Sequence, residues 1–244
     1  MSKAVECYKK AIEQEDDHAM LALGAMYYRG EGVENDMVEA MHWSLEAAKR
    51  GDTTAMANVG HQYENGEGVE QDFVAAMAWY QRAANCGDSD AMQYVGEMYY
   101  YGKGVSEDLD SAREWFQKSL DEGNYEAVIP LGATCYFQSD YEKAVELFHG
   151  AAEKDSDVRS SAEYWLGNLY REGAGVEKDV SQAIDWYSKS VEHGNTGAML
   201  AMGELYADGK DMPKDVSKAK EWYQKALEAG DDEAQEYLDA LQEK

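Results

Sequence analysis

The feature that most constrains the fold of this chain is a sequence repeat with a period of 36 residues. An alanine opens each repeat, and consecutive opening alanines lie 36 residues apart, with a single step of 35. A repeat of this length cannot enclose a hydrophobic core alone, so neighbouring repeats must stack and bury their apolar faces against one another. The opening alanines are Ala19, Ala55, Ala91, Ala127, Ala162, Ala198 and Ala234.

Each repeat predicts two helices joined by a glycine-rich turn. In the second repeat, Asp52 is expected to cap the first helix, and Gly60 leaves room for a neighbouring helix to approach closely. The turn follows at residues 66–68, with the sequence Gly-Glu-Gly. Asp72 is expected to cap a second helix that carries Trp79 on its buried face. The repeat is therefore predicted to be an antiparallel helix hairpin.

The repeat pattern, A-x-x-x-(L/V/M)-G-x-x-Y-x-x-G-x-G-V-x-x-D-x-x-x-A-x-x-W, resembles that of the Sel1-like repeat (SLR) family, a relative of tetratricopeptide repeats (TPR). The resemblance extends over nearly the whole chain. It implies an all-α fold, a right-handed superhelical solenoid of stacked antiparallel helix hairpins. The segments that carry it most clearly are MYYRGEGV at 26–33, QYENGEGV at 62–69, MYYYGKGV at 98–105 and LYREGAGV at 169–176.

We expect one solenoid domain over residues 1–244, with half repeats at both ends. Residues 1–15 align with the second helix of a repeat, and residues 231–244 supply only a first helix. These segments either cap the solenoid or mark where a longer protein continues. The complete repeats are expected at 16–51, 52–87, 88–123, 124–158, 159–194 and 195–230.

The fourth repeat, 124–158, departs from the pattern. Cys135 takes the tyrosine position, Leu147 takes the tryptophan position, and four residues of the Gly-x-Gly turn are missing. This repeat therefore resembles a plain TPR. Pro130 lies inside its predicted first helix, where a proline removes a backbone hydrogen bond unless it falls in the first turn.

The charge of the chain restricts the kind of partner it can bind. The formal net charge is −27, which repels nucleic acid and anionic membranes and attracts basic partners. No apolar run approaches the ~20 residues that a membrane-spanning helix needs. We therefore expect neither nucleic-acid binding nor membrane insertion.

The cysteines and the N-terminal sequence predict a cytoplasmic protein. Cys7, Cys86 and Cys135 form no CxxC motif, and an odd, sparse set of cysteines is typical of reduced thiols. The first residues, MSKAVECYKKAIEQ, lack the apolar core of a secretion signal. A signal removed ahead of residue 1 would leave no trace, so a periplasmic or secreted location stays open.

No pattern in the sequence predicts catalysis. The Gly-x-Gly motifs lack a preceding strand and a GK[ST] or GxGxxG continuation, which phosphate-binding loops require, so they are interpreted as turns. The five histidines are scattered and form no HExxH motif. We therefore predict no catalytic residues, no metal ligands and no cofactor.

The first helices carry the candidate binding residues. In TPR-type solenoids, which this family resembles, first helices line the concave surface, and here they place aromatic rings beside acids. Aromatic rings are frequent anchors of protein interfaces. Successive helical residues are ~100° apart, so the tyrosines at 99–101 cannot share one environment. Tyr99 is predicted to be buried because a tyrosine recurs at its position in most repeats, and Tyr100 and Tyr101 are predicted to be accessible because other repeats carry charged or polar residues at theirs. The candidate partner-binding residues are Tyr28, His61, Glu97, Tyr100, Tyr101, Tyr136, Phe137, Tyr164 and Arg171.

The resemblance implies a non-catalytic scaffold or adaptor. The acidic and aromatic surface favours a protein or peptide partner with basic and apolar residues. An alternative is an immunity or inhibitor protein that occludes a toxin or enzyme, a role that suits an acidic solenoid. A third interpretation, a hydrolase, rests on a secreted branch of the family with regularly spaced cysteine pairs, which this chain lacks. The oligomeric state is not indicated by the sequence.

Salt should weaken the binding of a basic partner. The attraction of the −27 chain acts over a screening length of about 10 Å at 0.1 M salt and about 3 Å at 1 M. Titration calorimetry on the purified complex at low and high salt should show a rising dissociation constant. A constant that stays flat over this range would argue against a basic partner.

Overall fold

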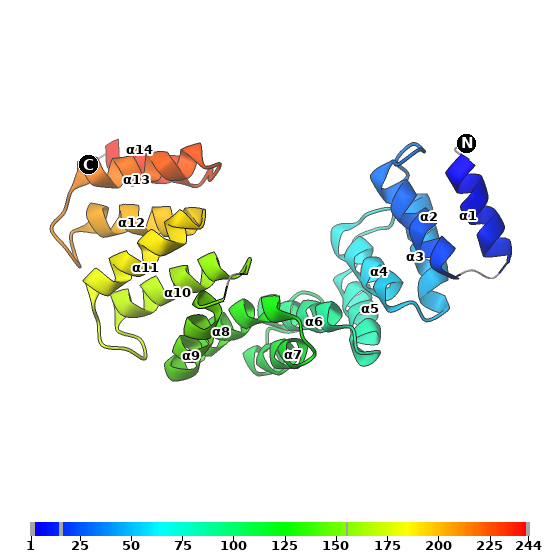
Figure 1. Ribbon diagram of the computed structural model, residues 1–244, viewed down its shortest axis with the longest axis horizontal. Coiled ribbons are helices and arrows are strands. Elements are labelled where there is room, and N and C mark those ends of the chain that lie inside the picture. Colours follow the sequence, from blue (N-terminus) through cyan, green and yellow to red (C-terminus); the bar gives the residue numbers. More distant parts are fainter. Residues whose placement is uncertain (1–2, 15–16, 155, 243–244) are drawn as a thin grey trace. The chain divides into compact units, whose positions relative to one another are not determined.

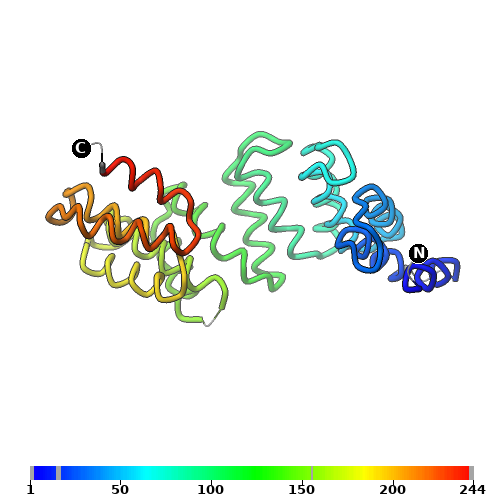
Figure 2. Tube along the Cα trace, turned by 90° about the horizontal axis from the view of Figure 1, so that it is seen from above, coloured from blue at the N-terminus to red at the C-terminus, as the bar shows by residue number. Residues whose placement is uncertain are grey.

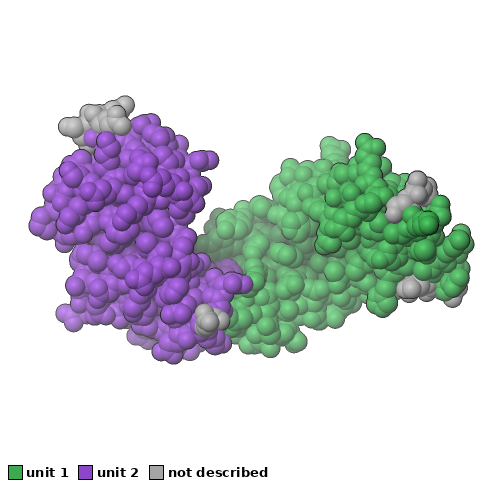
Figure 3. All heavy atoms as spheres, turned by 45° about the horizontal axis from the view of Figure 1, so that its top comes forward, with its two compact units in different colours: residues 1–127 green, residues 128–244 purple. Residues whose placement is uncertain are grey.

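The structure, a computed structural model, describes residues 3–14, 17–154 and 156–242. Within these ranges the chain is all-helical, as predicted. The predicted boundaries at residues 15–16, and the predicted terminal helices at residues 1–2 and 243–244, fall outside the described residues. The chain divides into two compact units, Met1–Ala127 and Val128–Lys244, and the division lies within the fourth repeat (Figure 3).

Unit 1 contains seven described α-helices and one 3-10 turn, and consecutive helices run back and forth (Figures 1 and 2). Its elements are α1 (Lys3–Glu13), α2 (Asp17–Arg29), α3 (Met37–Lys49), α4 (Thr53–Asn65), α5 (Phe73–Asn85), α6 (Ser89–Tyr101), α7 (Leu109–Asp121) and η1 (Tyr125–Ala127).

Unit 2 likewise contains seven described α-helices (Figures 1 and 2). They are α8 (Val128–Phe137), α9 (Tyr141–Ala152), α10 (Arg159–Glu172), α11 (Val180–Glu192), α12 (Thr196–Asp208), α13 (Val216–Glu228) and α14 (Ala234–Gln242).

The helices pack as stacked hairpins in both units. In unit 1, α2 pairs with α3, α4 with α5, and α6 with α7, while α3 contacts α4 and α5 contacts α6 between hairpins. Unit 2 repeats this arrangement with the pairs α8–α9, α10–α11 and α12–α13. Helix α1 packs on α2, and α14 packs on α13. This is the TPR/SLR-like solenoid that the repeats predict.

The predicted caps and turns are confirmed in the second repeat. The Asp72 carboxylate accepts hydrogen bonds from the amides of Val74 at 2.9 Å and Ala75 at 3.0 Å, which starts α5. The Asp72 amide donates to the Tyr63 carbonyl at 2.9 Å and so joins the two helices of the hairpin. Between them, Gly68 has a φ of 72°, and a Cβ there would overlap with the Met37 carbonyl at the start of α3. The turn therefore packs against the preceding hairpin.

An aromatic ring packed on a glycine forms the centre of most hairpins. The Tyr80 ring of α5 is fully buried, and a methyl group at Gly60 of α4 would lie 2.6 Å from it. Such a distance is below van der Waals contact, so only glycine admits the ring here. The same contact joins Gly96 to Phe116, Gly132 to Phe148, Gly167 to Tyr187 and Gly203 to Tyr223.

The prediction that Trp79 occupies the buried face of α5 is wrong in degree, because the adjacent Tyr80 takes the deep position. Trp79 is half-buried at the edge of the core, and the Arg82 guanidinium lies 4.6 Å from its ring centroid. A lysine takes the same place over Trp115, Trp186 and Trp222. The tryptophan thus closes the side of the core and supports a cation on its outer face.

The fourth repeat keeps the hairpin with a shorter turn. Pro130 is the third residue of α8, in the first turn, where its missing amide hydrogen has no helical acceptor to lose. Cys135 is buried in the tyrosine position, and its carbonyl accepts from the Asp140 amide at 2.8 Å. Ser139, with a φ of 63°, provides the left-handed conformation that glycines provide in the other turns.

The row of three tyrosines at the end of α6 divides between environments, only in part as predicted. Tyr99 is half-buried, because Met98 and Val95 take the deep positions on α6. Tyr100 is also half-buried, and Tyr101 is exposed. The prediction that Tyr99 is fully buried is therefore wrong, and the predicted accessibility of Tyr101 is confirmed.

The substitution Gly96→Ala should destabilise the protein by about 1–3 kcal/mol, as overpacked core sites do. Its methyl group would lie 2.7 Å from the Phe116 ring. Gly150 provides the matched control, because it is helical and exposed and has no atom within 4 Å of an added Cβ. Gly150→Ala should stabilise α9 by roughly 0.5–1 kcal/mol. Urea unfolding of both variants measures the difference, and equal effects would contradict the ring-on-glycine contact.

Candidate partner-binding surfaces

All nine candidate residues lie on the first helices of hairpins. The structure brings some of them into contact and leaves others in separate groups. In unit 1, α2 carries Tyr28, α4 carries His61, and α6 carries Glu97, Tyr100 and Tyr101. In unit 2, α8 carries Tyr136 and Phe137, and α10 carries Tyr164 and Arg171.

Tyr28 and His61 line one cavity of about 280 Å³ between α2, α3 and α4. The Tyr28 hydroxyl donates to Glu67 Oε1 at 3.3 Å, and desolvation together with this carboxylate raises the pKa of Tyr28. His61 is exposed, and its Nδ1 lies 2.8 Å from Asn65 Nδ2. The inner wall of the cavity is formed by buried residues, among them Ser44 and Gln62.

Glu97 lies near a polar network formed by α4, α5 and the turn after α6. Lys103 Nζ and the Tyr80 hydroxyl both bind Glu64, at 2.8 and 2.9 Å. Desolvation opposes ionisation of Glu64, but these two bonds outweigh it and lower the pKa of that carboxyl. Glu97 accepts from Gln93 Nε2 at 2.9 Å, and desolvation raises its pKa. The network therefore holds one firmly ionised acid and one that is partly desolvated.

Tyr100 and Tyr101 contact each other edge to face, with ring centroids 4.8 Å apart. Tyr100 also lies 6.5 Å from the Phe116 ring, and desolvation raises the pKa of its hydroxyl. Tyr101 is 65% exposed, and Lys103 Nζ lies 5.8 Å from its ring centroid. Tyr101 is thus the residue of this pair that presents most apolar area to a partner.

Tyr136 and Phe137 belong to an aromatic cluster in unit 2 that includes Tyr141 and Trp165. The Tyr136 ring lies 5.3 Å from Phe137, 5.5 Å from Tyr141 and 5.4 Å from Trp165. Phe137 is 55% exposed at the edge of this cluster. The Tyr136 hydroxyl binds Glu172, and desolvation together with this bond raises the pKa of Tyr136.

Tyr164 extends the same cluster along α10. Its ring lies 6.0 Å from Trp165 and 6.1 Å from the buried Tyr187. Trp165 in turn stacks on Phe148, with centroids 5.5 Å apart and an interplanar angle of 1°. The exposed Phe137 is therefore connected to the core through a continuous set of rings.

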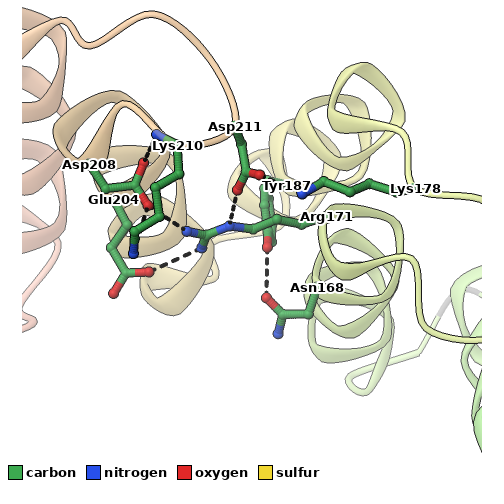
Figure 4. A network of polar contacts seen from close by, with 8 residues as sticks. All are labelled: Asn168, Arg171, Lys178, Tyr187, Glu204, Asp208, Lys210 and Asp211. Carbon is green, nitrogen blue, oxygen red and sulfur yellow. Dashed lines mark hydrogen bonds and ion pairs between the residues drawn. The ribbon is translucent and has the colours of Figure 1, made fainter.

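Arg171 binds three carboxylates of its own unit, as Figure 4 shows. Its guanidinium lies 3.1 Å from Glu204, 3.4 Å from Asp208 and 3.2 Å from Asp211. Desolvation opposes its charge, but the hydrogen bonds to Glu204 and Asp211 outweigh this and raise the pKa of Arg171. Lys178 binds Asp211 at 2.7 Å and is the main cause of the lowered pKa of that carboxyl.

The Arg171 network borders a second hollow, of about 490 Å³, lined by residues of α10, α12, α13 and α14. Because Arg171 is bound to acids, its own charge is largely neutralised where it borders the hollow. Its lining includes Glu204, Tyr223, Tyr237 and Leu241.

Three residues near these surfaces are missing from the sequence-based set. Trp165 lies outside the tryptophan period, and its place in the aromatic cluster depends on packing between hairpins. Ser44 is small where the other complete repeats carry a ring. Gln62 is polar where the other repeats carry an apolar side chain, except the fourth, which carries Thr134. A column-by-column comparison of the repeats shows both differences, but only the structure shows that these two columns line the interior of a hairpin.

The described residues hold no group of three or more His, Cys, Asp or Glu that could bind a metal ion. None of the described helices has the length and apolar character needed to cross a membrane.

Comparison with solved structures shows two relatives with about a third of their residues identical to this chain. A protective antigen of uropathogenic Escherichia coli with an SLR fold is 31% identical, with a TM-score of 0.73 over 96% of this chain and 50% of the antigen. The chain thus spans half the length of that antigen. A Sel1 repeat protein from Oxalobacter formigenes is 30% identical, with a TM-score of 0.71 over 88% of both chains.

A more distant similarity concerns the fold alone. An immunity protein from Pseudomonas aeruginosa is 21% identical, with a TM-score of 0.53 over 86% of this chain and 83% of that protein. No curated protein matches the chain significantly.

The family model for the Sel1 repeat matches seven segments that together cover most of the chain. The matched residues are 1–16, 17–52, 53–88, 89–124, 132–156, 160–195 and 196–231. The chain therefore belongs to the Sel1 repeat family, whose members are typically non-catalytic and mediate protein–protein interactions.

Proposed function

We propose that this chain is a non-catalytic scaffold or adaptor that binds a protein or peptide segment on the first helices of its hairpins. The cysteines support a cytoplasmic location, since none of the three forms a disulfide: Cys7 and Cys86 are exposed, and Cys135 is buried. The proposed binding residues are the nine named from the sequence, with Tyr101 as the aromatic anchor of unit 1 and Phe137 as that of unit 2.

The observation that carries this proposal is the exposure of rings at equivalent positions of the first helices. Six large apolar side chains are exposed among the described residues, and three of them are the aromatic residues Tyr28, Tyr101 and Phe137. Tyr101 and Phe137 both lie ten residues after the opening alanine of their repeats. Exposed aromatic rings contribute little to a core, whereas at an interface they bury a large area at a small entropic cost.

Charge defines the chemistry of the proposed partner. The net charge is −27, and Arg171 and Lys103 are both bound to acids of the chain. The field that a partner meets is therefore predominantly negative. A segment with lysine or arginine beside apolar residues would satisfy both the charge and the rings.

A second candidate function is that of an immunity protein that blocks an enzyme. An immunity protein from Pseudomonas aeruginosa shares the fold, and an acidic surface suits a basic toxin. This function requires a tight complex of fixed stoichiometry that abolishes the enzyme's activity. A scaffold leaves its partner active.

Removal of an anchor ring should weaken partner binding without unfolding the chain. Tyr101→Ala should change stability by under ~1 kcal/mol, as exposed positions do. It should raise the dissociation constant of the purified partner by about tenfold or more, as the loss of an interface anchor does. The partner is first captured from the native host, then purified and titrated by calorimetry.

Val74 provides the matched control, because it is also 65% exposed but lies at the start of a second helix. Val74→Ala should leave the dissociation constant unchanged. If both variants bind as the unchanged chain does, the first helices are not the binding surface. Activity assays on the captured partner separate the two functions, since complete inhibition at equimolar protein supports the immunity function.

A further inference from the structure

The cavity between α2, α3 and α4 lies where the first repeat lacks its aromatic ring. The ring that packs on the hairpin glycine is Tyr80, Phe116, Phe148, Tyr187 or Tyr223 in the other repeats. The equivalent residue of the first repeat is Ser44, which faces Gly24 with its Oγ 3.5 Å from the position of an added Cβ. Ser44 and Gly24 both line the cavity of about 280 Å³. This space is much larger than one water molecule needs.

A second irregularity lies in the same wall. Gln62 is 3% exposed, and its Oε1 has no hydrogen-bond partner. The equivalent residues in the third, fifth and sixth repeats are Met98, Leu169 and Leu205, all buried and apolar. A buried acceptor without a donor costs about 1–3 kcal/mol. The cavity therefore lacks two groups. The aromatic ring is missing at Ser44, and a hydrogen-bond donor is missing at Gln62 Oε1.

The missing groups together describe one kind of side chain. A tyrosine supplies a flat apolar ring of the size that this hairpin lacks and a hydroxyl that donates a hydrogen bond. The neighbouring hairpin, α4–α5, contains this combination, because the Tyr80 ring packs on Gly60 and its hydroxyl donates to Glu64 Oε2 at 2.9 Å. The exposed Tyr28 and His61 line the same cavity and leave it open to an incoming chain.

We propose that this cavity binds a tyrosine side chain of the partner. The ring occupies the space beside Gly24 and Ser44, and the hydroxyl donates to Gln62 Oε1. The proposal rests on the proposed protein-binding function and assigns one specificity pocket to it. Phenylalanine lacks the donor, and a tryptophan ring is larger than any that the other repeats accommodate, so tyrosine is expected to be preferred over both.

The test uses p-cresol, toluene and 3-methylindole as probes for the side chains of tyrosine, phenylalanine and tryptophan. Titration of the full chain, followed by amide NMR spectra, should give saturable p-cresol binding with shifts confined to α2, α3 and α4. Toluene and 3-methylindole should each bind about tenfold more weakly. Failure of p-cresol to saturate, or equal binding of toluene, would overturn the proposal.

Two variants and one control locate the site. Ser44→Phe restores the ring of the other repeats and should abolish p-cresol binding, whereas Ser44→Ala keeps the space open and should preserve it. Gln62→Leu removes the acceptor while keeping an apolar wall, so p-cresol and toluene should then bind equally. Thermal melts establish that each variant is folded. Unchanged p-cresol binding by Ser44→Phe, or an unchanged preference in Gln62→Leu, would contradict the assigned position.

The probes act on the chain alone, so this test is independent of the partner. If p-cresol binds as expected but Ser44→Phe leaves the affinity of the purified partner unchanged, the pocket exists and the partner does not use it, which refutes the tyrosine assignment. If p-cresol does not bind while Tyr101→Ala weakens the partner, the pocket proposal fails and the scaffold function stands.

Discussion

The contact between an aromatic ring and a helical glycine determines how closely the two helices of a hairpin approach. Glycine in a helix costs about 1 kcal/mol relative to alanine. Burial of a large apolar side chain gains about 1.5–3 kcal/mol, which exceeds the cost of the glycine. In the second repeat, Tyr80 reaches the backbone of Gly60 and fills the hairpin. The tryptophan beside it is then left at the edge of the core, where it supports a cation.

A backbone hydrogen bond fixes where the second helix of each hairpin begins relative to the end of the first. The amide of the capping aspartate donates to the carbonyl at the tyrosine position, as Asp72 does to Tyr63. This bond uses a carbonyl and not a ring, so the identity of the side chain is free to vary. Asp140 makes the same bond to Cys135, although the connecting turn is four residues shorter. The degenerate fourth repeat therefore keeps its hairpin geometry without the Gly-x-Gly turn.

The helices, caps and turns could be predicted from the sequence because each depends on residues within one repeat. Trp79 and Tyr80 are adjacent, and helical periodicity alone leaves a rotation of ~100° between them undecided. The recurrence of tyrosine predicts Tyr99 in the core, but the adjacent Met98 takes the deep position. The aromatic cluster around Trp165 depends on packing between hairpins.

The pocket could not be predicted because its two signals are departures from a rule that only the structure reveals. Ser44 is an ordinary helical serine until the ring-on-glycine contact is known. Gln62 becomes a candidate binding group only when its burial and its unpartnered Oε1 are seen. Recognition residues that differ between repeats are, for the same reason, hidden by any consensus of those repeats.

The self-contained nature of the ring-on-glycine contact has a consequence for how such proteins diversify. One substitution of a ring by a small residue costs about 3–5 kcal/mol and opens a hollow in one hairpin. Because each repeat contacts only its neighbours, this loss stays local and the other hairpins retain their packing. The hairpin that lacks its ring is then the one that can bind a side chain of a ligand. A family with this architecture can therefore acquire a new ligand specificity when one repeat loses its core ring, and the backbone stays unchanged.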